Sequence, residues 1–333
     1  MFRSSSRKHG IGIRAILVPL FASLGLLGFS LFLAAEHSPV GANAQTKIAV
    51  TANLVLLPVK VSDAHGAFVP GLKQEDFQVF EDGQPQKLTV FESRDTPVTV
   101  GLVVDHSKSM GPKLQDVVIA VSYFTHSSNP QDEMFVVDFN DDVSIELMKG
   151  KAFSSDVKDL EEALRAVSAR GLTALYDAVS EGLHHLQYGH FDKKALIIIS
   201  DGGDNASHLK YSQVLAQARQ AQAQIYSIGL VGSLEGEENP GLLRRLCKDT
   251  GGIAYFPRVG ESTASLAKEI ARDLREQYTL GYTPQNLKSA GAFRKIEVKV
   301  TAADHGKLRV RTRQGYTLTA DKPPAAQLEP AAK

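Results

Sequence analysis

The sequence contains no tryptophan and a single cysteine in 333 residues, and its 37 lysines and arginines equal its 37 aspartates and glutamates. One cysteine, Cys247, rules out an intrachain disulfide, so the fold must be stabilised by its core. Because Cys247 lies in an apolar helical pattern, we predict a buried structural residue and not a reactive thiol. The absence of net charge and of basic runs argues against a nucleic-acid-binding protein.

Two enzyme signatures are also missing from the sequence. There is no G-x-S-x-G nucleophile elbow and no G-x-x-x-x-G-K phosphate-binding loop. No histidine is placed by sequence as an evident base for Ser107 or Ser109. We therefore predict a binding protein that is not an enzyme, and a metal-dependent hydrolase or phosphotransferase using Asp105 remains the alternative.

The N-terminus carries the features of an export signal. Four basic residues, Arg3 to Arg14, precede an apolar stretch at 15–35, and an Ala-x-Ala site ends at Ala44. This order predicts a signal peptide over residues 1–44, cleaved near Ala44. The stretch is close to the roughly 20 residues of a membrane span, so an uncleaved inner-membrane tether through 15–35 is the alternative. Either way the body is expected to be exported, to the periplasm or the extracellular space.

Two short β-rich segments flank the centre of the chain. Residues 46–95 contain a strand pattern interrupted by Pro58, which predicts an edge or bulged strand, and a hairpin turn at 81–84. The β pattern returns over 278–320. Since neither segment has enough strands to bury a core alone, we predict that they pair into one antiparallel β-sandwich. The Pro/Ala-rich residues 321–333 are predicted to be a disordered tail.

Between these segments, residues 97–277 alternate between strand and helix patterns. Repeated βα units of this length predict an α/β domain: a doubly wound, mostly parallel sheet with helices on both faces. The domain would be inserted between the two halves of the sandwich, or flanked by them.

The most informative stretch is Val98 to Met110. An apolar, β-branched run ends at Asp105, and Ser107 and Ser109 follow at every second position. The run predicts a buried parallel strand. The three oxygen-bearing side chains then lie in a loop at its carboxyl end, where open α/β sheets place their ligand sites. One carboxylate and two hydroxyls suit a hard cation.

The segment Asp105-His-Ser-Lys-Ser109 resembles the D-x-S-x-S motif of the von Willebrand factor type A (VWA) domain. Thr173, within Gly171-Leu-Thr-Ala-Leu-Tyr-Asp-Ala178, resembles that family's second metal loop, and Asp201-Gly202 resembles its third. The flanks, including Gln277-Tyr-Thr-Leu-Gly-Tyr282, resemble a bacterial VWA-related group of exported proteins.

The resemblance implies a VWA (Rossmann-like) fold and a metal-ion-dependent adhesion site for Mg²⁺, with Mn²⁺ or Ca²⁺ as other options. Ser107, Ser109 and Thr173 would offer hydroxyl oxygens, and Asp105 and Asp201 the negative charge. An acidic residue of a protein partner would complete the metal's ligand shell. Four neighbours are expected at the partner-binding rim: His106, Asp204, Asn205 and His208.

Other roles are open for each of these residues. Ser107, Ser109 and Thr173 could cap helices, and Asp201-Gly202 could be a plain turn. A cell-envelope scaffold with an unused metal site is a further alternative for the whole protein.

Overall fold

The computed structural model describes residues 54–147, 150–165, 167–232, 238–285, 291–302 and 305–318, all within one compact unit, Val50–Lys333. The predicted signal peptide or anchor and the predicted tail lie outside the described residues. Among the described helices, none has both the length and the apolar character that crossing a membrane requires.

Six strands form the central sheet, in the order β10-β9-β8-β5-β6-β7. All neighbouring pairs are parallel except β6 with β7, which are antiparallel. The strands are β5 (Thr99–Asp105), β6 (Glu133–Phe139), β7 (Val143–Glu146), β8 (Lys194–Ser200), β9 (Gln224–Gly229) and β10 (Ala254–Tyr255). Every residue of β5 is buried, as expected for a central strand covered on both faces.

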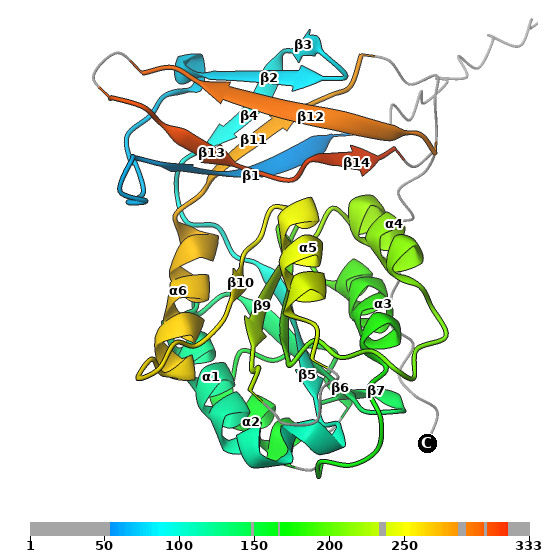
Figure 1. Cartoon of the computed structure of the whole chain (residues 1–333). Helices are drawn as coiled ribbons and strands as arrows, with labels where there is room; N and C mark the ends of the chain where they lie inside the picture. Colours follow the sequence, from blue (N-terminus) through cyan, green and yellow to red (C-terminus); the bar gives the residue numbers. More distant parts are fainter. Residues whose placement is uncertain are drawn as a thin grey trace, which may run out of the picture. The chain divides into compact units, whose positions relative to one another are not determined.

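Helices cover both faces of this sheet (Figure 1). Buried side chains of α1, α2 and α6 form a hydrophobic core on one face, and those of α3, α4 and α5 form a second core on the other. The helices are α1 (Leu114–Ser127), α2 (Val157–Arg165), α3 (Leu175–His185), α4 (Tyr211–Ala221), α5 (Pro240–Thr250) and α6 (Thr263–Arg275). Short 3₁₀ helices are η1 (Gln74–Asp76), η2 (Lys108–Lys113) and η4 (Leu186–Tyr188). The predicted doubly wound α/β fold is confirmed.

Local sequence explains where the helices begin and end. The Asn239 side chain accepts a hydrogen bond from the backbone N–H of Leu242 at 3.0 Å, and Pro240 occupies the first turn of α5. Gly251 ends that helix in the left-handed conformation, with φ of 86°. Ser262 caps α6 in the same way as Asn239 caps α5. Cys247 is buried within α5, as predicted, and burial raises the pKa of its thiol to about 12.

The remaining strands form two antiparallel four-stranded sheets, β13-β1-β11-β4 and β14-β12-β2-β3, which share a core. They are β1 (Val55–Ser62), β2 (Phe77–Glu81), β3 (Gln84–Gln86), β4 (Leu88–Glu92), β11 (Tyr278–Tyr282), β12 (Phe293–Val300), β13 (Arg309–Arg311) and β14 (Gly315–Thr317). Each sheet combines strands from before and after the central domain, as β1 with β11 and β2 with β12. The antiparallel sheets that the fold prediction expected beside the α/β domain are thus present. The exact domain boundaries stay a prediction.

The expectation for Pro58 is corrected in part. Its strand β1 is not at an edge, because it lies between β11 and β13. However, β13 pairs only with Lys60–Ser62. No strand pairs with Pro58 on that side of β1, so the missing N–H of the proline breaks no hydrogen bond of the sheet there. The Pro58 carbonyl instead accepts a hydrogen bond from the Thr312 hydroxyl at 2.8 Å.

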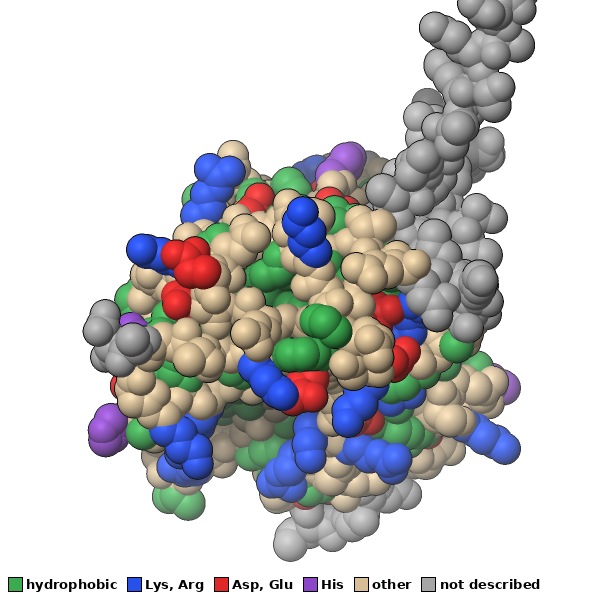
Figure 2. All heavy atoms as spheres, turned by 90° about the horizontal axis from the view of Figure 1, so that it is seen from above, with side chains coloured by type: hydrophobic (Ala, Val, Ile, Leu, Met, Phe, Trp, Pro, Cys, Tyr) green, Lys and Arg blue, Asp and Glu red, His purple; other side chains and the backbone are tan. Residues whose placement is uncertain are grey.

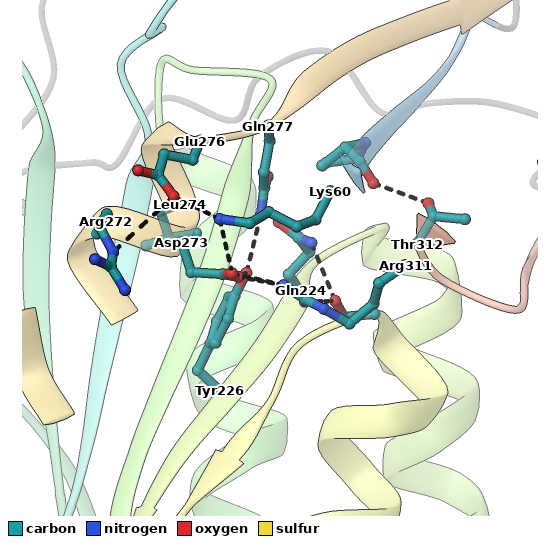
Figure 3. Close-up of polar contacts among 12 residues, drawn as sticks. Lys60, Gln224, Tyr226, Arg272, Asp273, Leu274, Glu276, Gln277, Arg311 and Thr312 are labelled. Atoms are coloured by element: carbon teal, nitrogen blue, oxygen red, sulfur yellow. Dashed lines mark hydrogen bonds and ion pairs between the residues drawn. The ribbon is translucent and has the colours of Figure 1, made fainter. Parts of the chain in front are cut away.

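A buried polar cluster joins the sandwich strands to the α/β domain (Figure 3). Arg311 of β13 donates to both carboxylate oxygens of Asp273 on α6, at 2.7 and 2.5 Å, and to the carbonyl of Gly251. The Tyr226 hydroxyl donates to Asp273 at 2.8 Å, and the Lys60 ammonium lies 3.5 Å from the same carboxylate. One carboxylate therefore connects β1, β13, β9 and α6.

The molecule seen from above carries side chains of both charge signs, with small apolar areas between them (Figure 2). On β12, the ammonium of Lys299 lies 3.4 Å from the Glu297 carboxylate and over the ring of Phe80. These charged side chains lie on the face of β12 that is exposed to water, as is common in antiparallel sheets.

Candidate metal site

Two loops of the central sheet bring the predicted acidic residues together. Asp105 is the last residue of β5, and Asp201 follows the last residue of β8, its parallel neighbour. Parallel neighbours end at the same edge of a sheet, so both loops start side by side. Both carboxylates are buried, with 0% and 3% of their surface exposed.

Neutral groups hold the Asp105 carboxylate. Its Oδ1 accepts from the backbone N–H of Ser107 at 2.8 Å, and its Oδ2 accepts from the Ser200 hydroxyl at 2.6 Å. The Ser200 oxygen in turn accepts from the N–H of Gly202 at 2.9 Å. Ser200 thus ties the first predicted metal loop to the third.

The two serines of the D-x-S-x-S segment lie against the third loop. The Ser109 hydroxyl donates to Oδ2 of Asp201 at 2.7 Å, across 92 residues of sequence. The Ser107 and Ser109 hydroxyl oxygens are 3.2 Å apart. Oδ1 of Asp201 accepts from the N–H of Gly203 at 3.2 Å. Asp105, Ser107, Ser109 and Asp201 therefore form one connected group.

Thr173 is buried next to the third loop through its backbone. Its N–H donates to the side-chain oxygen of Asn205 at 2.8 Å, and its carbonyl accepts from the N–H groups of Asn205 and Ala206 at 3.0 and 3.1 Å. Only 5% of its surface is exposed. This fixes the position of the residue, while the role of its hydroxyl as a ligand stays a prediction.

The second loop is also joined to the first. The N–H of Arg170 donates to the His106 carbonyl at 2.9 Å, and the N–H of Lys108 donates to the Gly171 carbonyl at 3.3 Å. The Asp141 side chain accepts from the N–H of Leu172 at 3.2 Å. All three predicted metal loops therefore contact one another.

The helix-capping alternatives do not account for these hydroxyls. The N-cap of α3 is Ala174, so the expectation of Thr173 as an N-cap is wrong. Ser107 does occupy the N-cap position of η2, but its side chain makes no capping hydrogen bond. Its hydroxyl lies beside that of Ser109 instead.

The charge balance of the group favours a cation. Burial, with a smaller contribution from the nearby Asp201 carboxylate, raises the pKa of Asp105 to about 6 against the lowering effect of its hydrogen bonds. Within the described ranges, no three or more His, Cys, Asp or Glu side chains group into a metal site. A cation here would depend on hydroxyl ligands beside the two carboxylates, which is a donor set that fits Mg²⁺.

The four predicted rim residues lie in different environments. His106 is 2% exposed and its ring contacts the buried Asp138 carboxylate, so its expected place at the surface is wrong. His208 is exposed and contacts Asp177 at 2.9 Å. Asn205 is exposed and orients Thr173.

Asp204 is half-buried, and its carboxylate accepts from the Ser207 hydroxyl at 2.5 Å and from the N–H of Tyr176 at 3.2 Å. Burial raises the pKa of this carboxyl group. The residue therefore ties the third loop to α3, whatever part it has at the rim.

Two residues of the site were missed from sequence. Ser200 follows the apolar run 195–199 and immediately precedes Asp201, a signal that could have been recognised. Lys113, whose ammonium lies 3.7 Å from Oδ2 of Asp201, gives no such signal, because it lies four residues beyond the motif, between Pro112 and Leu114.

The family model of the von Willebrand factor type A domain matches residues 99–269. The fold and the three connected loops agree with this match. The chain belongs to the von Willebrand factor type A domain family.

The chain is also similar to several solved structures, at low sequence identity. A von Willebrand factor type A protein from Catenulispora acidiphila is 14% identical, with a TM-score of 0.47 and coverage of 74% of each chain. The conserved hypothetical protein BatB from Bacteroides thetaiotaomicron is 18% identical (TM-score 0.45), covering 53% of this chain and 97% of that one. The von Willebrand factor domain of a type V pili tip protein from Porphyromonas gingivalis is 13% identical (TM-score 0.40), covering 54% and 95%. No curated protein matches the chain.

Proposed function

We propose that this VWA-domain protein is an exported binding protein that recognises a protein partner through a divalent cation. Asp105, Ser107, Ser109, Thr173 and Asp201 would hold the ion, with Mg²⁺ as the first choice and Mn²⁺ or Ca²⁺ as others. The observation that carries the proposal is the 2.7 Å hydrogen bond from Ser109 to Asp201. It brings oxygen ligands from two distant loops together at a buried, negatively charged position.

The donor set also supports the kind of partner. Two carboxylates neutralise a divalent ion only formally, and hydroxyl ligands add no charge. A bound ion of this type keeps waters in its shell and accepts a further anionic oxygen. An aspartate or glutamate side chain of a partner protein supplies such an oxygen. The chain's own part is to hold the ligands through Ser200, Gly202 and Asn205.

Two features support a binding role over an enzymatic one. Proteins of the VWA family are generally adhesion or scaffold proteins. The serine hydroxyls of the site are hydrogen-bonded to each other and to Asp201. The ring of His106 contacts Asp138 and does not act as a base for either serine.

The metal is tested first, by thermal unfolding of residues 46–333 in chelator and in Mg²⁺ or Mn²⁺ at about 100 times the Kd. Ligand at about 100 times its Kd stabilises a protein by about 2.7 kcal/mol, so a rise in Tm of several degrees is expected. Asp105→Asn should abolish the rise. Its effect on the metal-free protein should be small, because relief from burying a charge offsets the loss of one of the two hydrogen bonds that the carboxylate accepts.

Asp142→Asn is the matched control, since Asp142 is an exposed carboxylate in the turn that follows β6. It should keep the full cation response. A wild-type protein whose Tm is the same in chelator and in both cations would reject the metal site.

The partner is tested by affinity capture from envelope proteins, with wild type and Asp105→Asn as baits. Partners should be held in Mg²⁺ and released by chelator, and Asp105→Asn should not hold them. Capture that is unchanged in chelator would favour the scaffold alternative. Cation-dependent hydrolysis of ester or phosphate substrates, lost in Asp105→Asn, would favour an enzyme.

Export and tethering belong to the same proposal. The mass and the membrane association of the mature protein distinguish cleavage near Ala44 from retention of the apolar stretch at 15–35. A full-length protein recovered in the cytoplasm would contradict export.

A further inference from the structure

Lys113 is a half-buried cation at the edge of the proposed metal site. It is the last residue of η2, and its side chain is 17% exposed. Its ammonium lies 3.7 Å from Oδ2 of Asp201 and 3.6 Å from the Glu238 carboxylate, and it donates to the Leu230 carbonyl at 2.5 Å. Three acceptors therefore surround one positive charge, one from the loop after β8 and two from the connection between β9 and α5.

The carboxylate oxygen that faces Lys113 is the same one that accepts from Ser109. A metal ligand that already faces a positive charge attracts a second cation less strongly. At a separation of several ångströms, a unit charge changes the affinity of a divalent ion by about tenfold even with the screening of water.

From this geometry we infer that Lys113 is an internal counter-ion of the metal site: it stabilises the metal-free protein and weakens the binding of the divalent cation. The inference rests on the proposed function and deepens it, because it states what sets the affinity of that site. Together, Asp105, Asp201 and Glu238 supply three negative charges against this one ammonium. The site therefore keeps its attraction for a divalent cation, at a reduced strength.

The surroundings of Lys113 allow its ammonium to move. It lines an open cavity of about 210 Å³, together with Leu230, Val231 and Glu261. When a cation takes its place near Asp201, the ammonium keeps the Leu230 carbonyl and the Glu238 carboxylate as partners. Metal binding then breaks the contact between Lys113 and Asp201, but the ammonium is not left without a partner. A site of this kind loads and releases its ion without unfolding.

The test is the Kd of Mg²⁺ measured by titration calorimetry, and the Tm in chelator, for the wild type and Lys113→Gln. We expect Lys113→Gln to bind Mg²⁺ about tenfold more tightly, and to melt at a lower temperature in chelator. Lys113→Arg keeps the charge and should retain the wild-type affinity. The control is Lys87→Gln, an exposed lysine between β3 and β4 of the sandwich, outside the loops of the site, which should change the Kd by less than about twofold.

The outcomes separate this inference from the proposed function. A wild type that binds Mg²⁺, with an equal or weaker affinity in Lys113→Gln, overturns the counter-ion role alone. If neither protein binds Mg²⁺ or Mn²⁺, both proposals fail. A Lys113→Gln protein that folds in Mg²⁺ but unfolds in chelator, where the wild type stays folded, supports the inference.

Discussion

Two buried carboxylates of this protein have opposite kinds of partners. Asp273, between the α/β domain and the sandwich, accepts two hydrogen bonds from Arg311, and the Lys60 ammonium lies 3.5 Å away. Asp105, at the other site, accepts from a backbone N–H and from the Ser200 hydroxyl, both neutral. The first carboxylate is matched by cations of the protein itself, and the second is not.

The sandwich core repeats the matched arrangement. Glu81 is 4% exposed and accepts from the hydroxyls of Tyr282 and Tyr316, at 2.7 and 2.8 Å, and from the Arg294 guanidinium. A buried charge is tolerated when it is paired and fully hydrogen-bonded. The paired carboxylates of Asp273 and Glu81 therefore join strands and helices of the fold. The charge of Asp105 has no cation of the protein as a hydrogen-bond partner, and Asp201 shares the Lys113 ammonium with Glu238, so this is where we propose that an external cation binds.

The largest effect is expected where the matched cluster loses its carboxylate charge. Asp273→Asn leaves the positive charges of Arg311 and Lys60 without their shared partner, and breaking a buried pair in this way costs about 3 kcal/mol. Urea unfolding should show this loss, with the Mg²⁺ response retained. Glu276→Gln is the control: it contacts the same Lys60 at 2.7 Å but is 33% exposed, so its effect should stay below about 1 kcal/mol.

If Asp273→Asn proved as stable as wild type, the cluster would not serve to join the two parts of the fold. The difference between the two buried carboxylates would then have no consequence for stability.

A smaller effect is expected at the unmatched site from Thr173→Val, which replaces a hydroxyl by a methyl group of similar size. The backbone bonds to Asn205 and Ala206 are retained, so the fold should be preserved. Loss of one of the five proposed ligands should weaken Mg²⁺ binding by about tenfold, equivalent to about 1.4 kcal/mol. Titration calorimetry measures the change. An unaltered Kd would remove Thr173 from the ligand set and leave a site built from the first and third loops alone.

Strong periodic patterns predicted the fold well. The strand and helix patterns that alternate over 97–277 are observed as the central α/β domain, and its last helix, α6, begins directly after the Ser262 cap. The family resemblance located the three loops, and parallel pairing of β5 with β8 explains why two of them meet. The helices, strands and loops were predictable because each depends on a local sequence pattern that the tertiary contacts do not change.

The direction of individual side chains was not predictable in the same way. His106 is next to Asp105 in sequence, but its side chain turns inward to Asp138 of β6. Lys113 reaches Asp201 only because η2 brings it back to the third loop. Sequence adjacency places a residue in a loop, whereas the side it faces depends on the elements packed around that loop.

The smallest effect is expected at His185, where a neutral ring fills a buried position. Its Nε2 lies 3.0 Å from the Ala152 carbonyl, and its ring packs against Phe135 and Phe153 with centroids 4.4 and 5.1 Å away. Burial lowers the pKa of His185. The unfolded chain then binds more protons than the folded one as the pH falls below the unfolded pKa of about 6.5, so stability decreases on the acid side.

His185→Phe keeps a ring in this position and cannot be protonated, while the carbonyl of Ala152 loses its donor at every pH. The free energy of unfolding, measured in urea between pH 8 and 5, should therefore decline less steeply than in wild type, from a lower starting value. His184→Gln changes the exposed neighbour and should leave the slope as it is. Parallel pH profiles for wild type and His185→Phe would mean that this ring is protonated as readily in the folded protein as in the unfolded chain. Burial of the His185 ring would then make no contribution to the pH dependence of stability.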